Sequence, residues 1–435
     1  MAEDYVILKF ENLSAFDDDG FAATLAADVA EADSETSGAT LVSRITKARD
    51  DVAPKLERAS LSEAEARREK ARGGQLLVPQ ELPLALTDPI SNGAELEAAN
   101  DRAIAAIEGY GVSWGVEEVL GPNPDTSISG AGVRLAILDT GINAEHPSFE
   151  AVREGLEQRD FVAPGSTSAT DENGHGTHCA GTIFGRDYDD MRIGVAPGIK
   201  DVIVGRVLDA DGRGTIQNLL EAMNWLYSLK PQVVSMSLGF DFPRLFEVYL
   251  NRDLPPKFAA SKALKAYREG IEAFQALATA LSTPNHVNRG GALIIAASGN
   301  DSKRNIDRDL VIDVSVPAVS SRDIVSVGAL QKAGSQLDIA YFSNNNPVVA
   351  APGVGIFSAS LDGKLKSSNG TSMACPHVAG VAALWWEWLE RRDGPTDAAA
   401  VKAKLLGTAA TDHLLCGRID RGAGMPRAPQ ARQVS

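Results

Sequence analysis

The chain of 435 residues has 42 basic and 58 acidic side chains, and its formal net charge is −16. This excess of acidic groups argues against nucleic acid as a partner, because a phosphate backbone attracts positive charge. No apolar run reaches the roughly 18 residues that a membrane-spanning helix needs, so no membrane segment is expected. The three cysteines, Cys179, Cys375 and Cys416, lack the spacing of a zinc site and predict no disulfide framework. If Met1 is the native start, the absence of a signal-peptide pattern predicts a cytoplasmic protein.

Residues 1 to about 110 differ in pattern from the rest of the chain and predict a small α+β domain. The alternation in Tyr5–Phe10 predicts a strand, and Ser60–Arg72 predicts a helix that starts with a capping box from Ser60 to Glu63. Leu76–Leu86 returns to an extended pattern interrupted by prolines. The further elements expected here are a helix at Phe21–Ala32, a strand at Ala39–Ile45 and a linking helix at Glu95–Gly109.

From residue 111 onward, short apolar runs alternate with helical segments. Val133–Leu138 is nearly continuous in apolar residues, which is typical of a strand buried on both faces of a parallel sheet. Similar runs lie at Val202–Leu208, Val233–Leu238, Ala292–Ala297 and Ile324–Leu330. Thr215 can cap a helix that Pro231 stops and whose apolar face is Ile216, Leu219, Leu220, Met223 and Leu226. We therefore predict an α/β fold with a doubly wound, mostly parallel sheet, and a functional site beyond the carboxyl ends of its strands.

One serine stands where a glycine turn meets a long apolar segment. Ser372 precedes an alanine-rich run that predicts a long buried helix, and Pro376 fits the first turn of that helix. Unpaired backbone N–H groups and the positive end of the helix dipole gather at such a position. An ordinary capped helix has the same pattern, so this serine alone does not establish a catalytic site.

Two further polar residues adjoin glycine-containing turns. Asp139 directly follows the first buried strand, although an aspartate before a turn is common in any protein. His175 stands between Gly174 and Gly176, which predicts a helix start packed too closely for large side chains. A serine, a histidine and an aspartate together provide the nucleophile, the general base and its orienting carboxylate that acyl transfer requires.

These motifs resemble the three signatures of the subtilisin-type serine proteases, the subtilases. They read Asp-Thr-Gly-Ile from Asp139, Gly-His-Gly-Thr-His-Cys-Ala-Gly-Thr around His175, and Gly-Thr-Ser-Met-Ala-Cys-Pro-His-Val-Ala-Gly around Ser372. The likeness extends from about Trp114 to Gly424. It implies that these three residues form a catalytic triad, in an endopeptidase that cleaves protein or peptide substrates through an acyl-enzyme.

The resemblance also implies an oxyanion hole and a substrate-binding edge. Asn300 would form the oxyanion hole with the backbone N–H of Ser372, although an asparagine after a buried strand is often only a turn residue. Two segments would line the substrate: the strand edge Ser237, Leu238 and Gly239, and the opposite wall of the primary specificity pocket, Ala297, Ser298 and Gly299. A bound peptide would add as a β-strand. The small apolar walls favour a hydrophobic residue before the scissile bond, while Asp301 leaves a basic one open.

The N-terminal region, residues 1–110, takes the place of the inhibitory propeptide of this family, with weak sequence similarity. On that interpretation it is an intramolecular inhibitor and chaperone, and the chain cuts itself somewhere in Leu86–Val112. A permanent domain that docks a partner is the alternative.

The catalytic domain, residues 111–435, contains an insertion around residues 241–282. It comprises Phe242–Phe258 and a lengthened helix near Ala259–Leu281. Because it follows the substrate strand directly, it is expected either to overhang the cleft and narrow substrate choice or to decorate the surface.

No metal is expected in catalysis. His175 and His178 lack a third ligand, and zinc sites use at least three protein ligands. Structural calcium is possible at Asp187, Asp189 and Asp190, although a solvated acidic turn explains the same residues. Cys179 and Cys375 are predicted to be small buried fillers whose nearness to the triad makes the enzyme sensitive to mercurials.

Two other functions fit the same motifs. A peptide ligase or cyclase would use the same acyl-enzyme, and a pseudoprotease would bind peptides without cutting them. The second is disfavoured because all four implied catalytic positions are intact.

Overall fold

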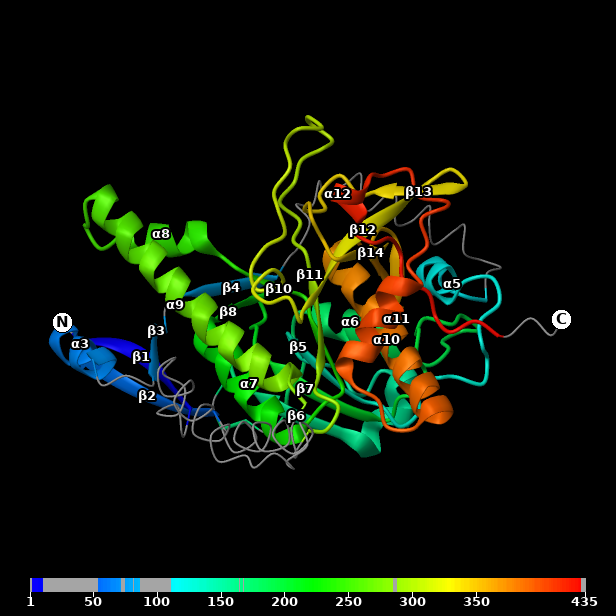
Figure 1. The fold of residues 1–435 in the computed structure, drawn as a ribbon, viewed down its shortest axis with the longest axis horizontal. Coiled ribbons are helices and arrows are strands. Elements are labelled where there is room, and N and C mark those ends of the chain that lie inside the picture. Colours follow the sequence, from blue (N-terminus) through cyan, green and yellow to red (C-terminus); the bar gives the residue numbers. More distant parts are fainter. Residues whose placement is uncertain are drawn as a thin grey trace, which may run out of the picture.

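The computed structural model describes residues 2–10, 54–71, 75–80, 82–86, 111–163, 165–166, 168–284 and 288–431. Its main sheet has the strand order β13-β12-β11-β9-β5-β7-β6, and β14 also pairs with β12 (Figure 1). These strands are β5 (Arg134–Asp139), β6 (Leu156–Asp160), β7 (Asp201–Arg206), β9 (Val233–Met236), β11 (Leu293–Ala297), β12 (Val325–Ala333), β13 (Gln336–Ile339) and β14 (Val349–Pro352). All pairs in this sheet are parallel except β12 with β13, so the prediction of a mostly parallel sheet is confirmed.

Helices cover both faces of this sheet. One core includes α6 (His175–Phe184) and α10 (Thr371–Asp393), and the other includes α7 (Ile216–Leu229) and α9 (Pro256–Ser282). Strand β5 shows how the two cores are divided, because Leu135 and Ile137 belong to the first and Ala136 and Leu138 to the second. Side chains of a strand alternate between faces, so a run of apolar residues fills both cores at once.

The remaining elements of the catalytic domain are short. They are α5 (Trp114–Leu120), the 3₁₀ helix η2 (Pro147–Gly155), β8 (Arg213–Thr215), β10 (Leu238–Phe240), α8 (Phe242–Leu250), β15 (Ile356–Ala359), β16 (Leu365–Ser368), α11 (Ala398–Gly407) and α12 (Arg418–Arg421). Among the described residues, no helix is both long and apolar enough to cross a bilayer.

Most predicted elements of the catalytic domain are present. Helix α7 starts after Thr215, whose hydroxyl accepts from the backbone N–H of Asn218, and the predicted apolar face is buried. One predicted strand is wrong, because Val233–Leu238 divides into β9 and β10. Ser237 separates the two, and β10 pairs in a different sheet.

The described part of the N-terminal region has three strands and a helix in one unit. The strands are β1 (Ala2–Phe10), β2 (Pro54–Ser62) and β3 (Gln75–Pro79), in an antiparallel sheet of order β2-β1-β3, and the helix is α3 (Glu63–Ala71). The predicted helix start at Ser60 is wrong, because β2 continues through Ser62. The capping box instead joins Ser62 and Glu65, whose carboxylate accepts from the Ser62 N–H at 2.8 Å. The helices predicted at 21–32 and 95–109 and the strand at 39–45 lie outside the described residues.

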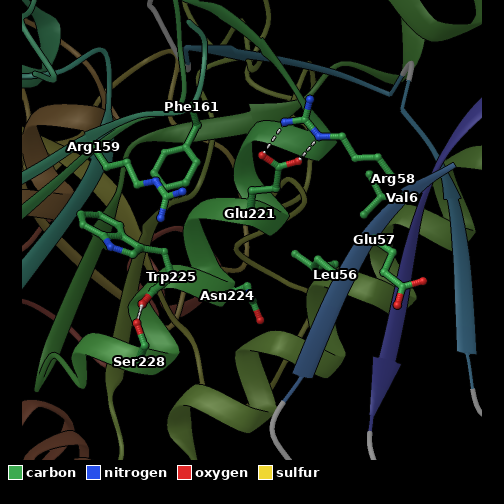
Figure 2. Close-up of a pocket in the computed structure, with 10 residues that line it drawn as sticks. All are labelled: Val6, Leu56, Glu57, Arg58, Arg159, Phe161, Glu221, Asn224, Trp225 and Ser228. Atoms are coloured by element: carbon green, nitrogen blue, oxygen red, sulfur yellow. Dashed lines mark hydrogen bonds and ion pairs between the residues drawn. The ribbon is translucent and has the colours of Figure 1, made fainter. Parts of the chain in front are cut away.

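This N-terminal unit packs against α7 and α9. Val6, Leu8 and Val78 are fully buried in the core that contains those helices. Figure 2 shows the seam, where the Arg58 guanidinium faces the Glu221 carboxylate of α7 across two hydrogen bonds of 2.8 Å. A cavity of about 360 Å³ opens beside this pair and shares no residue with the predicted catalytic site.

The insertion forms α8 and α9, which lie beside β3 and β4 (Pro83–Leu86) in Figure 1. Gly270 of α9 approaches Leu82 so closely that an added Cβ would lie 2.5 Å from its Cδ2. The Lys70 ammonium of α3 pairs with the Glu269 carboxylate, which is buried. The Asp241 N–H, just before α8, donates to the Pro83 carbonyl at 2.9 Å. The insertion therefore contacts the N-terminal region directly.

Candidate active site

Asp139 and His175 lie in direct contact. Asp139 is the last residue of β5, and His175 is the first of α6. The imidazole Nδ1 lies 2.7 Å from a carboxylate oxygen of Asp139, and both side chains are buried. A Cβ on Gly176 would lie 2.2 Å from the Gly141 carbonyl oxygen, so only glycine lets α6 approach this strand so closely. The close helix start predicted from the flanking glycines is present.

A buried aspartate that the sequence analysis missed fixes this approach. One carboxylate oxygen of Asp171 accepts from the Thr140 hydroxyl at 2.9 Å, and the other accepts from the Thr177 hydroxyl at 2.6 Å. Thr140 in turn accepts from the backbone N–H of Gly176 at 2.9 Å. Asp171 therefore ties the residue after Asp139 to the first turn of α6. In the sequence, Asp171 stands three residues before Gly174, a pattern that predicts only an ordinary turn.

The electrostatics distinguish His175 from the other buried histidines. Burial opposes its protonation, but the Asp139 carboxylate and Cys179 together outweigh that effect and raise the pKa of His175 well above its ordinary value. Burial lowers the pKa of His178 to about 3 and that of His377 to about 4, so both stay neutral near pH 7. Nε2 of His178 also donates to the Ile356 and Lys366 carbonyls. Of His175, His178 and His377, only His175 is therefore suited to take up and release a proton.

Ser372 is the second residue of α10, so the predicted helix and the place of the serine at its start agree with the structure. The predicted place of Pro376 is wrong, because α10 begins at Thr371 and the proline lies in its second turn. Since proline has no N–H, the carbonyl of Ser372, four residues earlier, has no helical donor. That oxygen accepts instead from the Ser237 hydroxyl at 3.2 Å and from the Cys179 thiol at 3.4 Å.

Cys179 links the serine to the histidine. Its sulfur lies 3.9 Å from Nδ1 of His175 while it donates to the Ser372 carbonyl. Nε2 of His175 is buried and has no partner. The structure therefore brings the three predicted residues into one buried cluster.

Asn300 lies next to the start of α10. Its side-chain oxygen accepts from the backbone N–H of Thr371 at 2.9 Å and from the Thr371 hydroxyl at 2.8 Å. These two bonds fix which end of the amide is the donor. Its Nδ2 group is buried without a partner, and its oxygen is bonded to Thr371, the residue before Ser372. An unpartnered buried donor is costly, and such a donor is what a developing oxyanion requires.

The predicted substrate edge is occupied by the chain itself. In the antiparallel sheet β10-β4-β8, Leu86 pairs with Leu238 and Ala85 with Gly239 on one side, and Leu84 pairs with Gly214 on the other. Strand β4 is thus the central strand of this sheet, between β10 and β8. The β8 edge was missed because three residues with a central glycine give no strand pattern.

The other predicted wall lies at the end of β11. Ala297 is its last residue, and the Ser298 carbonyl accepts from the Ser315 N–H at 2.9 Å and the Ser315 hydroxyl at 3.1 Å. Gly299 has a positive φ of 106° and donates its N–H to the Thr371 hydroxyl. This wall is therefore continuous with Asn300 and the start of α10.

The sequence profile of the subtilase family matches residues 130–425. The chain belongs to the subtilase family. Subtilisin BL of Lederbergia lenta is 33% identical over 274 residues, which cover 63% of this chain and 83% of that protein. A cuticle-degrading serine protease of Arthrobotrys oligospora is 33% identical over 292 residues, 66% of this chain and 58% of that protein. A crystal structure of a cold-adapted subtilisin-like serine proteinase matches 74% of this chain and all of its own, with a TM-score of 0.52 and 26% identity. This subtilase is accordingly a subtilisin-like serine endopeptidase.

Two further predictions concern the cysteines and calcium. Cys179 and Cys375 are buried, as predicted, and Cys416, for which no burial was predicted, is buried too; none of the three is in a disulfide. Calcium binding at Asp187, Asp189 and Asp190 stays a prediction. Asp189 and Asp190 form a tight turn in which the Tyr188 N–H donates to the Met191 carbonyl at 2.9 Å, and Asp187 directly precedes Tyr188.

Proposed function

We propose that this subtilase hydrolyses peptide bonds through an acyl-enzyme on Ser372, with His175 as general base and Asp139 as its orienting partner. The observation that carries the proposal is a pair of buried, unpartnered groups, Nε2 of His175 and Nδ2 of Asn300, beside the helix start that bears the serine. Each is fixed at its other end, the imidazole by Asp139 and the amide by Thr371. Both groups are thus held in one orientation and free to bind reacting atoms.

The proposed steps follow from this geometry. Ser372 attacks the substrate carbonyl while Nε2 of His175 takes its proton, and Asp139 stabilises the imidazolium that forms. Nδ2 of Asn300 and the backbone N–H of Ser372 donate to the oxyanion. The imidazolium then protonates the leaving amine, and water attacks the acyl-enzyme by the same steps in reverse.

A fluorophosphonate probe tests the nucleophile. It should label the wild type and leave Ser372→Ala unlabelled, and a wild type that is not labelled would favour the pseudoprotease alternative. The ligase or cyclase alternative predicts products joined to an added amine, which mass spectrometry detects.

We also propose that the N-terminal region inhibits the enzyme by placing β4 where a substrate binds. The support is the pairing of β4 with both β10 and β8. The register gives the direction of β4. Its carboxyl end pairs with Leu238, and the hydroxyl of Ser237, the residue before Leu238, donates to the Ser372 carbonyl. Strand β4 therefore runs toward the nucleophile, as the acyl side of a substrate would.

Intact-mass analysis tests maturation. Wild type should lose an N-terminal fragment by a cut within Leu86–Val112, and Ser372→Ala should stay at full length. A fully active wild type of unchanged mass would instead support a permanent N-terminal domain.

A further inference from the structure

The cavity at the N-terminal seam, about 360 Å³ in volume, has walls from two parts of the chain (Figure 2). Val6 and Leu56 come from the N-terminal unit, and Phe161 and Trp225 come from the catalytic domain. Small-molecule sites in proteins usually measure about 300–1,000 Å³. The cavity is therefore large enough for a small ligand, and a ligand inside it would contact both parts of the chain at once.

The wall from the catalytic domain is aromatic. Phe161 directly follows β6, and the centroid of its ring lies 5.6 Å from that of Trp225 on α7. The Phe161 backbone is held on both sides, because its N–H donates to the Arg206 carbonyl at 2.9 Å and its carbonyl accepts from the Asn218 amide at 2.8 Å. The two rings thus form a fixed surface, the aromatic wall, against which a planar apolar group can pack.

One cation beside this wall is not neutralised. The cavity is also lined by two carboxylates, and each already has a cationic partner. Glu221 pairs with Arg58, and Glu57 pairs with Lys9. The Arg159 guanidinium lies against the aromatic wall and makes no hydrogen bond or ion pair with any described residue. The lining therefore has one uncompensated positive charge, in a chain whose net charge is −16.

These groups favour one class of ligand. A guanidinium binds a carboxylate through two parallel hydrogen bonds, which are stronger than bonds between neutral groups. The Arg159 guanidinium lies 5.3 Å from the centroid of the Phe161 ring, so a carboxylate bound to it would leave an attached ring beside the aromatic wall. Asn224 also lines the cavity and adds a side-chain amide that can donate. The matching ligand is a small aromatic carboxylate.

We propose that the seam cavity binds a small aromatic carboxylate, and that the bound ligand holds the N-terminal region on the catalytic domain. Leu56 of β2 and Trp225 of α7 line opposite sides of the cavity, so it loses one wall when the two parts separate. A ligand that binds only the joined state stabilises that state as its concentration rises above Kd. The effect of the ligand on activity, a delayed release from inhibition, rests on the proposed inhibition by the N-terminal region.

Binding is measured by ligand-observed NMR on full-length Ser372→Ala, with cinnamate as the probe and cinnamamide as its uncharged analogue. We expect cinnamate to bind at least about tenfold more tightly than cinnamamide, because only the carboxylate pairs with Arg159. Adding Arg159→Ala should remove this difference. That side chain is exposed and carries no hydrogen bond, so its loss should leave the fold intact.

The chain offers a matched control for this arginine. The Arg252 guanidinium also lies over an aromatic ring, 5.4 Å from the centroid of Tyr249, and its side chain is also exposed. It does not line the seam cavity. Arg252→Ala removes the same charge from a similar setting, and we expect it to leave the affinity for cinnamate unchanged within about twofold.

Amide hydrogen exchange of β2 tests whether the ligand holds the seam together. Exchange that requires the N-terminal unit to separate should slow about tenfold when cinnamate is present at about ten times its Kd. At the same concentration, the Arg159→Ala variant should show little slowing.

Three results would overturn the proposal: no binding of cinnamate to the full chain, equal loss of affinity in Arg159→Ala and Arg252→Ala, or unchanged exchange of β2 in the saturated complex. None of these measurements uses cleavage by the enzyme itself. Failure of the proposed endopeptidase activity is seen separately, because the fluorophosphonate probe would then not label the wild type.

Discussion

The reacting groups and the N-terminal seam of this subtilase are held by different kinds of contact. Asp139, His175 and Ser372 are each at least nine-tenths buried, and backbone or side-chain hydrogen bonds fix them within one core. At the seam, Arg58 meets Glu221 with its side chain 52% exposed, and Lys70 meets Glu269 at 36% exposure. Exposed ion pairs contribute little free energy, so the fully buried Val6, Leu8 and Val78 hold the seam more strongly than its ion pairs do. The comparison teaches that polar contacts set the geometry of the predicted catalytic residues, whereas at the seam they lie at the margin of an apolar contact.

Replacement of Asp139 by asparagine should have the largest effect. We expect Asp139→Asn to lower kcat by about 10⁴-fold, the size known for related triads including that of subtilisin. Because the carboxylate raises the pKa of His175, and the base must be neutral, wild-type activity rises with pH as the imidazole loses its proton. In the pH profile of the activity that Asp139→Asn retains, the rise of kcat/KM with pH should therefore move to lower pH. An unmoved limb would mean that another group titrates.

Removal of the proposed oxyanion donor should lower the activity less. Asn300→Ala should lower kcat by about 10²–10³-fold with little change in KM, and that size is the one measured for subtilisin's own asparagine. Steady-state kinetics on an aminocoumarin amide measure it. A larger change in KM than in kcat would mean that the amide binds the ground state instead.

A mercurial should act through Cys179. Because its sulfur contacts both the Ser372 carbonyl and the His175 ring, a bound mercury must displace one of them, and we expect at least about a tenfold loss of kcat/KM. Cys179→Ala should resist the reagent, and Cys375→Ala should remain sensitive as the control. Full activity with both thiols shown by mass to be mercurated would contradict this.

The seam should show the smallest effects, and they should be unequal. Lys70→Ala leaves the buried Glu269 carboxylate unpaired, so we expect the initial activity of the full chain to rise about tenfold. Arg58→Ala removes a more exposed pair and should raise it less than about threefold. Initial rates before self-cleavage measure both. Equal effects would show that burial does not rank these two contacts.

The sequence predicted what local patterns and motifs encode. Continuous apolar runs gave β5, β7 and β11 within one or two residues, because strands buried on both faces leave that signature. The motifs identified Asp139, His175 and Ser372 as a group. Contacts between distant segments left no such pattern. Neither the pairing of Thr371 with Asn300 nor the addition of β4 between β10 and β8 can be inferred from spacing along the chain.

The unpartnered polar atoms of the active site have a consequence for stability. Oδ2 of Asp139, Nε2 of His175 and Nδ2 of Asn300 are all buried without hydrogen bonds, and each such atom costs about 1–3 kcal/mol of folding free energy. The resting enzyme is thus less stable than its packing would allow. A ligand that supplies those bonds, such as a transition-state analogue, should raise the melting temperature by more than its contact area alone would suggest.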